Sequence, residues 1–326
     1  MIPDRILDGY GLNEHLVTRA SQDGIDTILT CDNGISAIDQ IHLAKSLGMT
    51  VVVTDHHEVP FTEVDGVRRE KVCEADAVVN PKQQACHYPF KKLCGAAVAF
   101  KLVQVLYEVF GLEVSEADCF IENAGFATVG DVMDLQGENR ILVKLGLEML
   151  NRTTNIGMKA LILQNKLTMG AIKSHDIGFR IGPCLNASGR LDTARLSLKL
   201  LLCESETEAA VLAEEIVELN ESRKLLTMHA VEQAKEIAQQ EEYVNDRVLV
   251  IFLPDCHESL AGIVAGRIRE AYYRPTLVVT RSEHGAKGPR SLKLFMYEEL
   301  CKCEEYLTTV WRTSDGSGFF TKGSGY

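Results

Sequence analysis

The sequence predicts an α/β protein in which a parallel-sheet domain is joined by a long helical connector to a smaller α/β domain. Two β-branched runs, 26–30 and 50–54, have the composition of buried strands. Between them, Ser36 is expected to cap a helix that runs to Leu47 and is closed by Gly48. Two neighbouring strands joined through a helix are parallel, so a βαβ unit is expected near the start of the chain.

The other elements are expected in order along the chain. A short strand is predicted at 77–80, helices at 95–110, 117–129 and 140–165, and further strands at 247–252 and 276–280. The amphipathic stretch 204–242 contains neither Pro nor Gly. Its heptad pattern is irregular, which favours one or two helices between domains over a coiled coil.

The composition is that of a globular protein without a membrane span. The chain has 326 residues, of which 46% are hydrophobic and 25% charged, and it contains no run of 18 apolar residues. Its first residues lack the features of a signal peptide. Ten cysteines occur without CxxC spacing, so we expect free thiols and a cytoplasmic location.

The charge is acidic overall but basic in one segment. The net charge of −12 argues against coating of the whole surface by nucleic acid. Residues 267–293 nevertheless contain seven Lys or Arg against two acids, a local charge of +5. A basic face in an acidic protein suits an anionic ligand, and a solvated surface is the alternative.

Polar residues follow the two strands of the βαβ unit at the edge where α/β sheets place their ligands. Asp32 follows the first strand, and Asp55, His56 and His57 follow the second. Asp32, His56 and Asp131 form a mixed oxygen and nitrogen set that suits manganese, iron or zinc, and such a centre can hydrolyse phosphate esters. Asp55 is expected to orient His56. Taken singly, Asp32 is also a good turn residue and Asp131 a good helix cap.

Several motifs resemble those of known proteins. TCDNGIS (30–36), VVVTDHHEVP (51–60), VNPK (79–82), LCGAAVAFKL (93–102) and ATVGDVMDL (127–135) resemble motifs of the DHH phosphoesterase family. IGPCLNASGRL (181–191) is similar to the end of the first domain in the RecJ branch of that family. HESLAGIVAGRI (257–268) and GAKGPRS (285–291) are similar to its DHHA1 domain. The resemblance extends from about residue 2 to 309.

The resemblance implies a domain plan and an activity. The plan is a DHH domain at 1–195, a helical connector at 196–243, an incomplete DHHA1 substrate-binding domain at 244–309 and a non-native tail at 310–326. The implied activity is metal-dependent 5′→3′ exonucleolytic hydrolysis of single-stranded DNA in repair and recombination. Two Mn²⁺ (or Mg²⁺) ions would serve the parent enzyme, and no membrane is involved.

The resemblance also assigns roles to individual residues. Asp32, His56 and Asp131 would be metal ligands. The catalytic residues would be Asp55, His56 and His57. The substrate would be bound by Asn186, Arg190, His257, Arg290 and Ser291, where the planar guanidinium of arginine suits phosphate oxygens.

Both ends of the chain depart from the family pattern. The family begins with a strand that carries a DxD motif, whereas Asp4 and Asp8 here lie on no apolar strand. We therefore expect an N-terminally truncated, inactive or nearly inactive chain. The possible codons for residues 310–319, read one nucleotide later, can encode a Gly-Gly-His segment like that of the family. This reading predicts a frameshift in the gene near Thr309. Codons that forbid this segment would refute the prediction.

Two other functions remain open from the sequence. One is an oligonucleotide or nucleotide phosphatase of the DHH superfamily, which would prefer very short substrates. The other is a non-catalytic DNA-binding scaffold, which the missing DxD motif favours and the retained Asp32, His56 and Asp131 oppose. A scaffold is expected to bind no metal.

Overall fold

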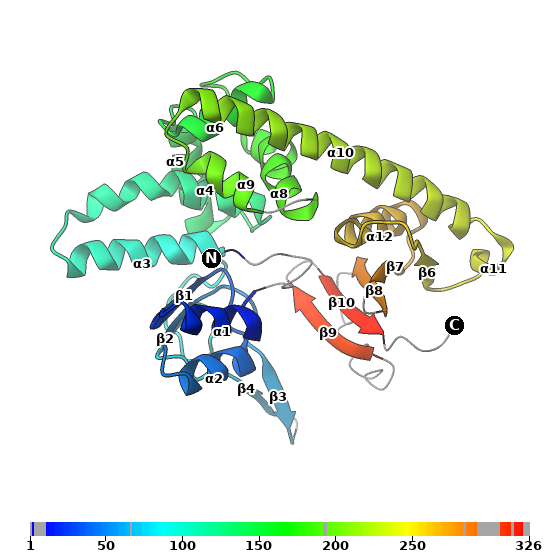
Figure 1. Cartoon of the computed structure of the whole chain (residues 1–326), viewed down its shortest axis with the longest axis horizontal. Helices are drawn as coiled ribbons and strands as arrows, with labels where there is room; N and C mark the ends of the chain where they lie inside the picture. Colours follow the sequence, from blue (N-terminus) through cyan, green and yellow to red (C-terminus); the bar gives the residue numbers. More distant parts are fainter. Residues whose placement is uncertain are drawn as a thin grey trace. The chain divides into compact units, whose positions relative to one another are not determined.

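The computed structural model describes residues 2, 11–65, 67–191, 194–282, 285–291, 307–313 and 316–321. The chain divides into two compact units, Met1–Val217 and Glu218–Tyr326. The long helix α10 (Glu206–Ala238) contributes residues to both units. Figure 1 shows the elements of each unit.

The first unit contains the predicted parallel sheet. Its strands β1 (Thr27–Cys31), β2 (Thr50–Thr54) and β5 (Ala77–Val79) lie in the order β1-β2-β5, and both pairings are parallel. In register, Cys31 lies opposite Thr54 and Thr54 opposite Val79. The three strands therefore end at one common edge, as the βαβ pattern predicts.

Helices α1 (Glu14–Gln22) and α2 (Ile38–Ser46) pack on this sheet. Val17 and Ile41 on the helices and Val51 and Val53 on β2 are fully buried together, which keeps apolar surface from water. The prediction of Ser36 as the helix cap is wrong. Ala37 precedes the first helical residue without a side-chain cap, because residues 34–37 form a turn closed by the Ala37 N–H and the Gly34 carbonyl.

A hairpin of β3 (Phe61–Val64) and β4 (Val67–Glu70) follows β2 and was not predicted from the sequence. After β5 the first unit is helical. Its helices begin with α3 (Gly95–Val109), η1 (Val114–Phe120), α4 (Ile121–Gly130), α5 (Gly137–Leu150) and α6 (Ile156–Gln164). The region 140–165, expected to be helical, is interrupted because Asn155 caps a new helix by accepting a bond from the Met158 N–H at 2.8 Å.

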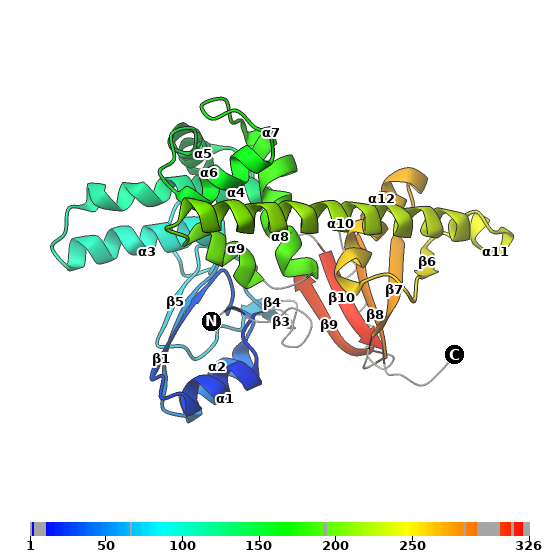
Figure 2. The ribbon, with the colours of Figure 1, turned by 45° about the horizontal axis from the view of Figure 1, so that its top comes forward.

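The helical part of the first unit continues through α7 (Ser174–Asp176), the π-helical turn η2 (Ile177–Ile181), α8 (Gly182–Leu191) and α9 (Ala194–Leu201). Figure 2 shows these helices beside α10. Their shared core includes Leu161 of α6, Ile177 and Ile181 of η2, and Ile216 of α10. This helical layer fixes α4, which carries Asp131 at its end.

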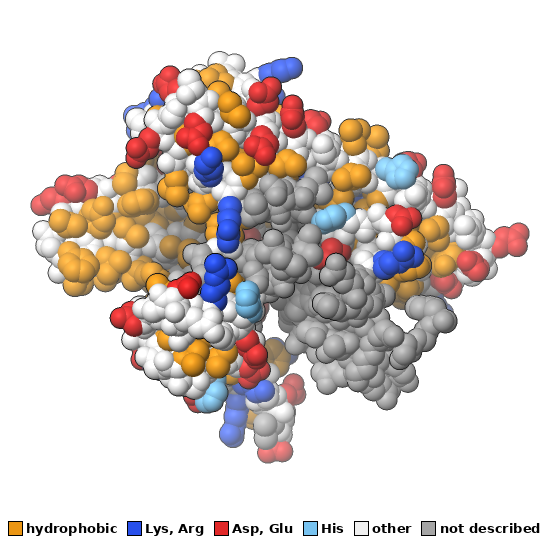
Figure 3. All heavy atoms as spheres, viewed as in Figure 1, with side chains coloured by type: hydrophobic (Ala, Val, Ile, Leu, Met, Phe, Trp, Pro, Cys, Tyr) orange, Lys and Arg blue, Asp and Glu red, His pale blue; other side chains and the backbone are white. Residues whose placement is uncertain are grey.

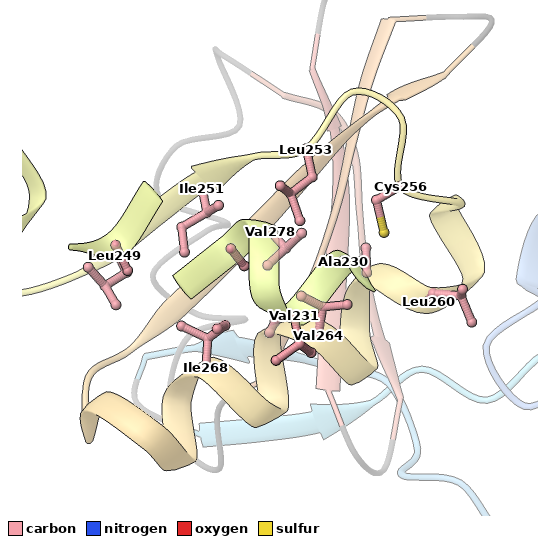
Figure 4. Packing of buried hydrophobic residues seen from close by; sticks show 14 residues of the cluster. Ala230, Val231, Leu249, Ile251, Leu253, Cys256, Leu260, Val264, Ile268 and Val278 are labelled. Carbon is pink, nitrogen blue, oxygen red and sulfur yellow. The ribbon is translucent and has the colours of Figure 1, made fainter. Parts of the chain in front are cut away.

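The second unit is a mixed sheet covered by helices. Its strands are β6 (Leu249–Phe252), β7 (Thr276–Ser282), β8 (Gly285–Ser291), β9 (Leu307–Thr313) and β10 (Gly316–Thr321). They lie in the order β6-β7-β8-β10-β9. Besides α10, this unit contains the helices α11 (Glu241–Val244) and α12 (Glu258–Tyr272). Figure 4 shows Ile251 and Val278 of the sheet facing Val264 and Ile268 of α12.

The expected non-native tail includes part of β9 and all of β10, which pair antiparallel with one another. The frameshift concerns the gene and stays a prediction for the nucleotide sequence to test.

The surface of the first unit is apolar in one place. Figure 3 shows hydrophobic side chains gathered over the α3 region, where Val105, Val109 and Phe110 are exposed. In the described part of the chain, no helix combines the length and hydropathy needed to cross a bilayer.

Candidate metal centre

The candidate centre is built where the parallel strands end. Asp32 follows β1, Asp55 follows β2 and Asn80 follows β5. The Asp32 N–H donates to the Thr54 carbonyl at 3.0 Å, and the Asp55 N–H donates to the Val79 carbonyl at 3.0 Å. The ladder thus continues for one residue past each strand, so the polar side chains leave the sheet from defined positions.

The conformation of Asp32 turns its side chain toward helix α3. Asp32 has a φ of 63°, a left-handed conformation that aspartate tolerates better than most residues. Its carboxylate packs against Gly95, the first residue of α3, where a Cβ would stand 2.3 Å from Oδ1. The N-terminus of a helix favours a negative charge, so α3 supports this carboxylate.

His56 lies between two carboxylates. Its Nε2 is 3.0 Å from Asp32 Oδ1 and 3.4 Å from Asp131 Oδ2, and its side chain is only 2% exposed. Asp131 comes from the end of α4, 99 positions after Asp32 in the sequence, as its number shows. Within the part of the chain that the structure describes, His56 Nδ1 has no hydrogen-bond partner. The structure therefore brings together the three residues predicted as metal ligands.

The Asp55 carboxylate makes no hydrogen bond to the His56 ring, contrary to the expectation that it would orient His56. Its Oδ1 accepts a bond from His57 Nδ1 at 2.7 Å and from the His56 backbone N–H at 2.7 Å. Its Oδ2 accepts from the Ile35 N–H at 2.9 Å. The reason is geometric. The ring of His57 turns back to the Asp55 carboxylate, whereas the ring of His56 points toward Asp32.

These contacts shift the pKa values of both partners. Burial raises the pKa of Asp55. Hydrogen bonds from His57 and from the Ile35 backbone together lower this pKa by more than burial raises it, so the net shift is downward. The hydrogen bond to Asp55 raises the pKa of His57, although burial opposes this. Since a carboxylate only accepts, the His57 Nδ1 carries the proton and Nε2 is left for another partner.

Asn80 holds the backbone that carries His57. Its Nδ2 donates to the His57 carbonyl at 2.9 Å, and its Oδ1 accepts from the Lys82 N–H at 2.8 Å. Its side chain is buried. The sequence analysis assigned no role to Asn80 or to Gly95. The available signals were the position of Asn80 directly after a third parallel strand and the glycine in LCGAAVAF.

Several of these residues bring possible metal-ligand atoms close together. One ligand atom each from Asp32, His56 and His57 lies within 4.8 Å of the others. Asp131 adds a carboxylate beside His56. A set of two carboxylates and two imidazoles suits a divalent transition metal, and manganese accepts such oxygen-rich sites.

The residues predicted to bind substrate lie in both units. Asn186 is exposed on α8, and Arg190 lies one turn further along that helix. In the second unit, His257 caps α12, and its Nδ1 lies 2.7 Å from Ser259 Oγ. Arg290 and Ser291 belong to β8. The side chains of Arg190, Arg290 and Ser291 lie outside the described part of the structure.

A family model and the sequences of known proteins both resemble this chain. Residues 1–123 match the N-terminal domain model of the DHH family. The chain is 36% identical over 310 residues to the single-stranded-DNA-specific exonuclease RecJ of Bacillus subtilis, covering 94% of this chain and 37% of that protein. It is 32% identical over 298 residues to RecJ of Escherichia coli, covering 87% of this chain and 50% of that protein.

Solved structures show the same likeness. The crystal structure of RecJ from Thermus thermophilus in complex with Mn²⁺ superposes with a TM-score of 0.79 at 28% identity, over 95% of this chain and 44% of that one. A manganese-bound structure of exonuclease RecJ gives 0.80 at 29% identity, over 98% of this chain and 77% of that one. The chain spans half or less of the length of the two curated relatives named above.

Proposed function

Since this chain belongs to the DHH family and its relatives along most of its length are RecJ exonucleases, we propose that it carries the metal centre of a 5′→3′ exonuclease specific for single-stranded DNA. The reaction is hydrolysis of a phosphodiester in DNA repair and recombination, in the cytoplasm. The relatives favour this function over an oligonucleotide phosphatase or a non-catalytic scaffold.

The observation that carries the proposal is the position of His56 between Asp32 and Asp131. The Nε2 of this buried imidazole lies 3.0 Å from Asp32 Oδ1 and 3.4 Å from Asp131 Oδ2, so it brings a nitrogen ligand beside two carboxylates. A ring nitrogen of His57 lies in the same cluster, and the His57 ring is held by Asp55. The donor set therefore fits a divalent metal, and Asp32, His56, His57 and Asp131 would hold it. A bound metal supplies polarisation of a phosphate oxygen and of the attacking water.

The protein's own residues supply orientation. Asp55 accepts from the His57 ring and from the backbone of His56, so one buried carboxylate ties both histidines to the end of the sheet. Asn80 fixes the backbone after them. These bonds hold the site in place without substrate, which lowers the cost of assembling it during reaction.

Substrate binding is proposed for residues of both units. Asn186 and Arg190 of α8 would contact phosphates of the single strand, as would His257, Arg290 and Ser291 of the second unit. Charged donors suit this role because most contacts to nucleic acid are made to its phosphates. The basic residues of 267–293 belong to the same second unit.

Metal binding tests the centre independently of nuclease activity. Mn²⁺ titration followed by the electron paramagnetic resonance of the free ion is expected to show binding by the wild-type chain and its loss in His56→Gln. The matched control is His42→Gln, which removes a histidine whose ring is 72% exposed and which lies in the same unit. Equal binding by wild type and His56→Gln would contradict the proposed centre.

Nucleotide release tests the reaction. Single strands labelled at the 5′ end or at the 3′ end are incubated with the chain and Mn²⁺, beside duplexes and dinucleotides. Early release of the 5′ label from the single strand, lost in His56→Gln, supports the exonuclease. Preference for dinucleotides would favour the phosphatase, and binding of DNA without any release of nucleotide in the presence of Mn²⁺ would favour the scaffold.

A further inference from the structure

Helix α8 begins with an irregular turn that has a cause in the sequence. Residues 174–191 are continuously helical, but η2 inside them is a π-helical turn. Pro183 lacks an N–H, and its ring would crowd the carbonyl four residues earlier in an ordinary helix. The wider turn is closed by the Gly182 N–H, which donates to the Ile177 carbonyl five residues earlier. A Cβ on Gly182 would stand 2.7 Å from that oxygen. Single π-helical turns occur frequently at functional sites.

This turn leaves an aromatic pair on the surface. The rings of His175 and Phe179 stack with centroids 4.6 Å apart and an interplanar angle of 25°. Phe179 is 70% exposed, whereas Ile177 and Ile181 from the same turn are buried in the core. Single exposed hydrophobic residues are ordinary. Here, however, the exposed ring stacks on a second ring and points away from the core.

The surroundings of the pair contain two cations and one acid, a small excess of positive charge. Arg180 follows Phe179 and is held by its Nη2 donating to the Asn165 carbonyl at 2.6 Å, with Asp176 at 3.7 Å from Nη1. Lys173 is exposed directly before the segment. An ordered aromatic surface next to cations is the combination that binds single-stranded nucleic acid, since bases stack and phosphates pair with the charges.

A residue proposed to bind DNA is exposed further along the same helical segment. In α8, Gly182, Cys184, Ala187 and Ser188 are buried, and Asn186 is exposed. Asn186 lies seven residues after Phe179 in one continuous helical segment, roughly 10 Å further along its axis. Arg190 follows one turn later. A strand whose phosphates meet Asn186 would therefore pass close to Phe179.

We propose that His175 and Phe179 form a stacking platform for a base of the single strand. This proposal rests on the proposed function, because it assumes that DNA lies along α8. The occupant is a nucleobase, and the platform tolerates different bases because each has an aromatic face.

Binding to two kinds of strand tests the platform. The full chain in EDTA is titrated into a labelled oligo-dT and into a strand of equal length made of abasic sites, which keeps the phosphates and lacks the bases. Phe179→Ala is expected to weaken binding of oligo-dT by about 5- to 150-fold and to leave the abasic strand unaffected. Phe179→Trp is expected to restore binding, and its added tryptophan fluorescence is expected to be quenched by oligo-dT.

The matched control is Phe110→Ala, because Phe110 is 73% exposed on the same unit but lies at the end of α3. Unchanged thermal unfolding of Phe179→Ala checks that the variant is folded.

Three outcomes would contradict the platform. If Phe179→Ala weakens the binding of both strands equally, or of neither while the wild type binds DNA, the platform is wrong and the proposed function stands. If the wild type binds neither strand, the platform is wrong, and nucleotide release with Mn²⁺ decides the proposed function separately. Equal losses in Phe110→Ala and Phe179→Ala would also refute the platform.

Discussion

Gly95 and Asp32 are packed so closely that a side chain on Gly95 has no room. A Cβ at Gly95 would stand 2.3 Å from Asp32 Oδ1 and 2.5 Å from both Asp32 Cβ and Cγ. The short distance to Asp32 Cβ shows that the conflict involves the base of the side chain as well as its mobile tip. The N-terminus of α3 can therefore approach the carboxylate only because residue 95 is glycine.

Gly95→Ala is expected to displace Asp32 and to weaken the metal centre. Loss of a group that positions a ligand typically lowers metal affinity by about 10- to 100-fold. Overpacking also destabilises the fold by about 1–3 kcal/mol. The first effect is measured by Mn²⁺ titration and the second by urea unfolding in the absence of metal.

The control for Gly95→Ala is Gly178→Ala, where a Cβ would meet Val129 Cγ1 at 3.9 Å, an ordinary contact. This variant is expected to bind Mn²⁺ as the wild type does. Unchanged Mn²⁺ affinity in Gly95→Ala would mean that Asp32 has another way to reach the ion.

Gly125→Ala is expected to separate helices α4 and α5. A Cβ at Gly125 would stand 2.6 Å from the Leu142 carbonyl oxygen and 3.0 Å from Gly146 Cα, both of which are backbone atoms that do not yield easily. We expect a loss of about 1–3 kcal/mol in the free energy of unfolding, measured with urea. Gly130→Ala, on the same helix with no atom within 4 Å of the added Cβ, is expected to be neutral or slightly stabilising. Equal stability of the two variants would contradict this close packing.

The sheet and most of the centre could be predicted because they follow from local patterns. The β-branched run before Asp55 and the crossover helix give parallel strands, and parallel strands put Asp32 and His56 at one edge. Asp131 was grouped with them for its donor chemistry, and no local pattern predicts that it lies beside them. It comes from a distant helix, whose position depends on how α4 packs rather than on its own residues.

The details that the sequence did not reveal are matters of tertiary contact. Asp55 was expected to orient His56, but its carboxylate binds the ring of His57 instead. Which of two adjacent histidines turns back depends on the backbone after the strand. Asn80 helps to fix that backbone through the His57 carbonyl. The same holds for Gly95, since only the folded chain places it beside Asp32.

Glu122→Gln is expected to stabilise the protein near pH 7. Burial raises the pKa of Glu122, and the hydrogen bond from Thr153 Oγ1, at 2.7 Å, offsets this in part. The folded protein therefore holds this proton more tightly than the unfolded chain. Stability is lost as the pH rises above the unfolded pKa of about 4.3, and glutamine avoids the loss while still accepting the bond from Thr153.

Urea unfolding of Glu122→Gln and wild type is measured from pH 4 to pH 7. The variant is expected to be the more stable at pH 7, with a difference that shrinks toward pH 4. Glu148→Gln, at an exposed position of α5, is the control and should show a smaller change. A difference that grows as the pH falls would have the wrong sign for a raised pKa.

Cys256 is expected to resist alkylation although it lies in the loop between β6 and α12. Burial raises the pKa of its thiol to about 11, and only 8% of the residue is exposed. At pH 8 about one thiol in a thousand is then ionised, and the thiolate is the reactive form.

Cys119, which is exposed, serves as the internal comparison. Iodoacetamide at pH 8, followed by mass spectrometry of peptides, should modify Cys119 well before Cys256. In urea the two should react at similar rates, because unfolding removes the burial that protects Cys256. Rapid modification of Cys256 in the folded protein would show that the packing of Leu253 and Leu260 around this end of α12 opens readily in solution.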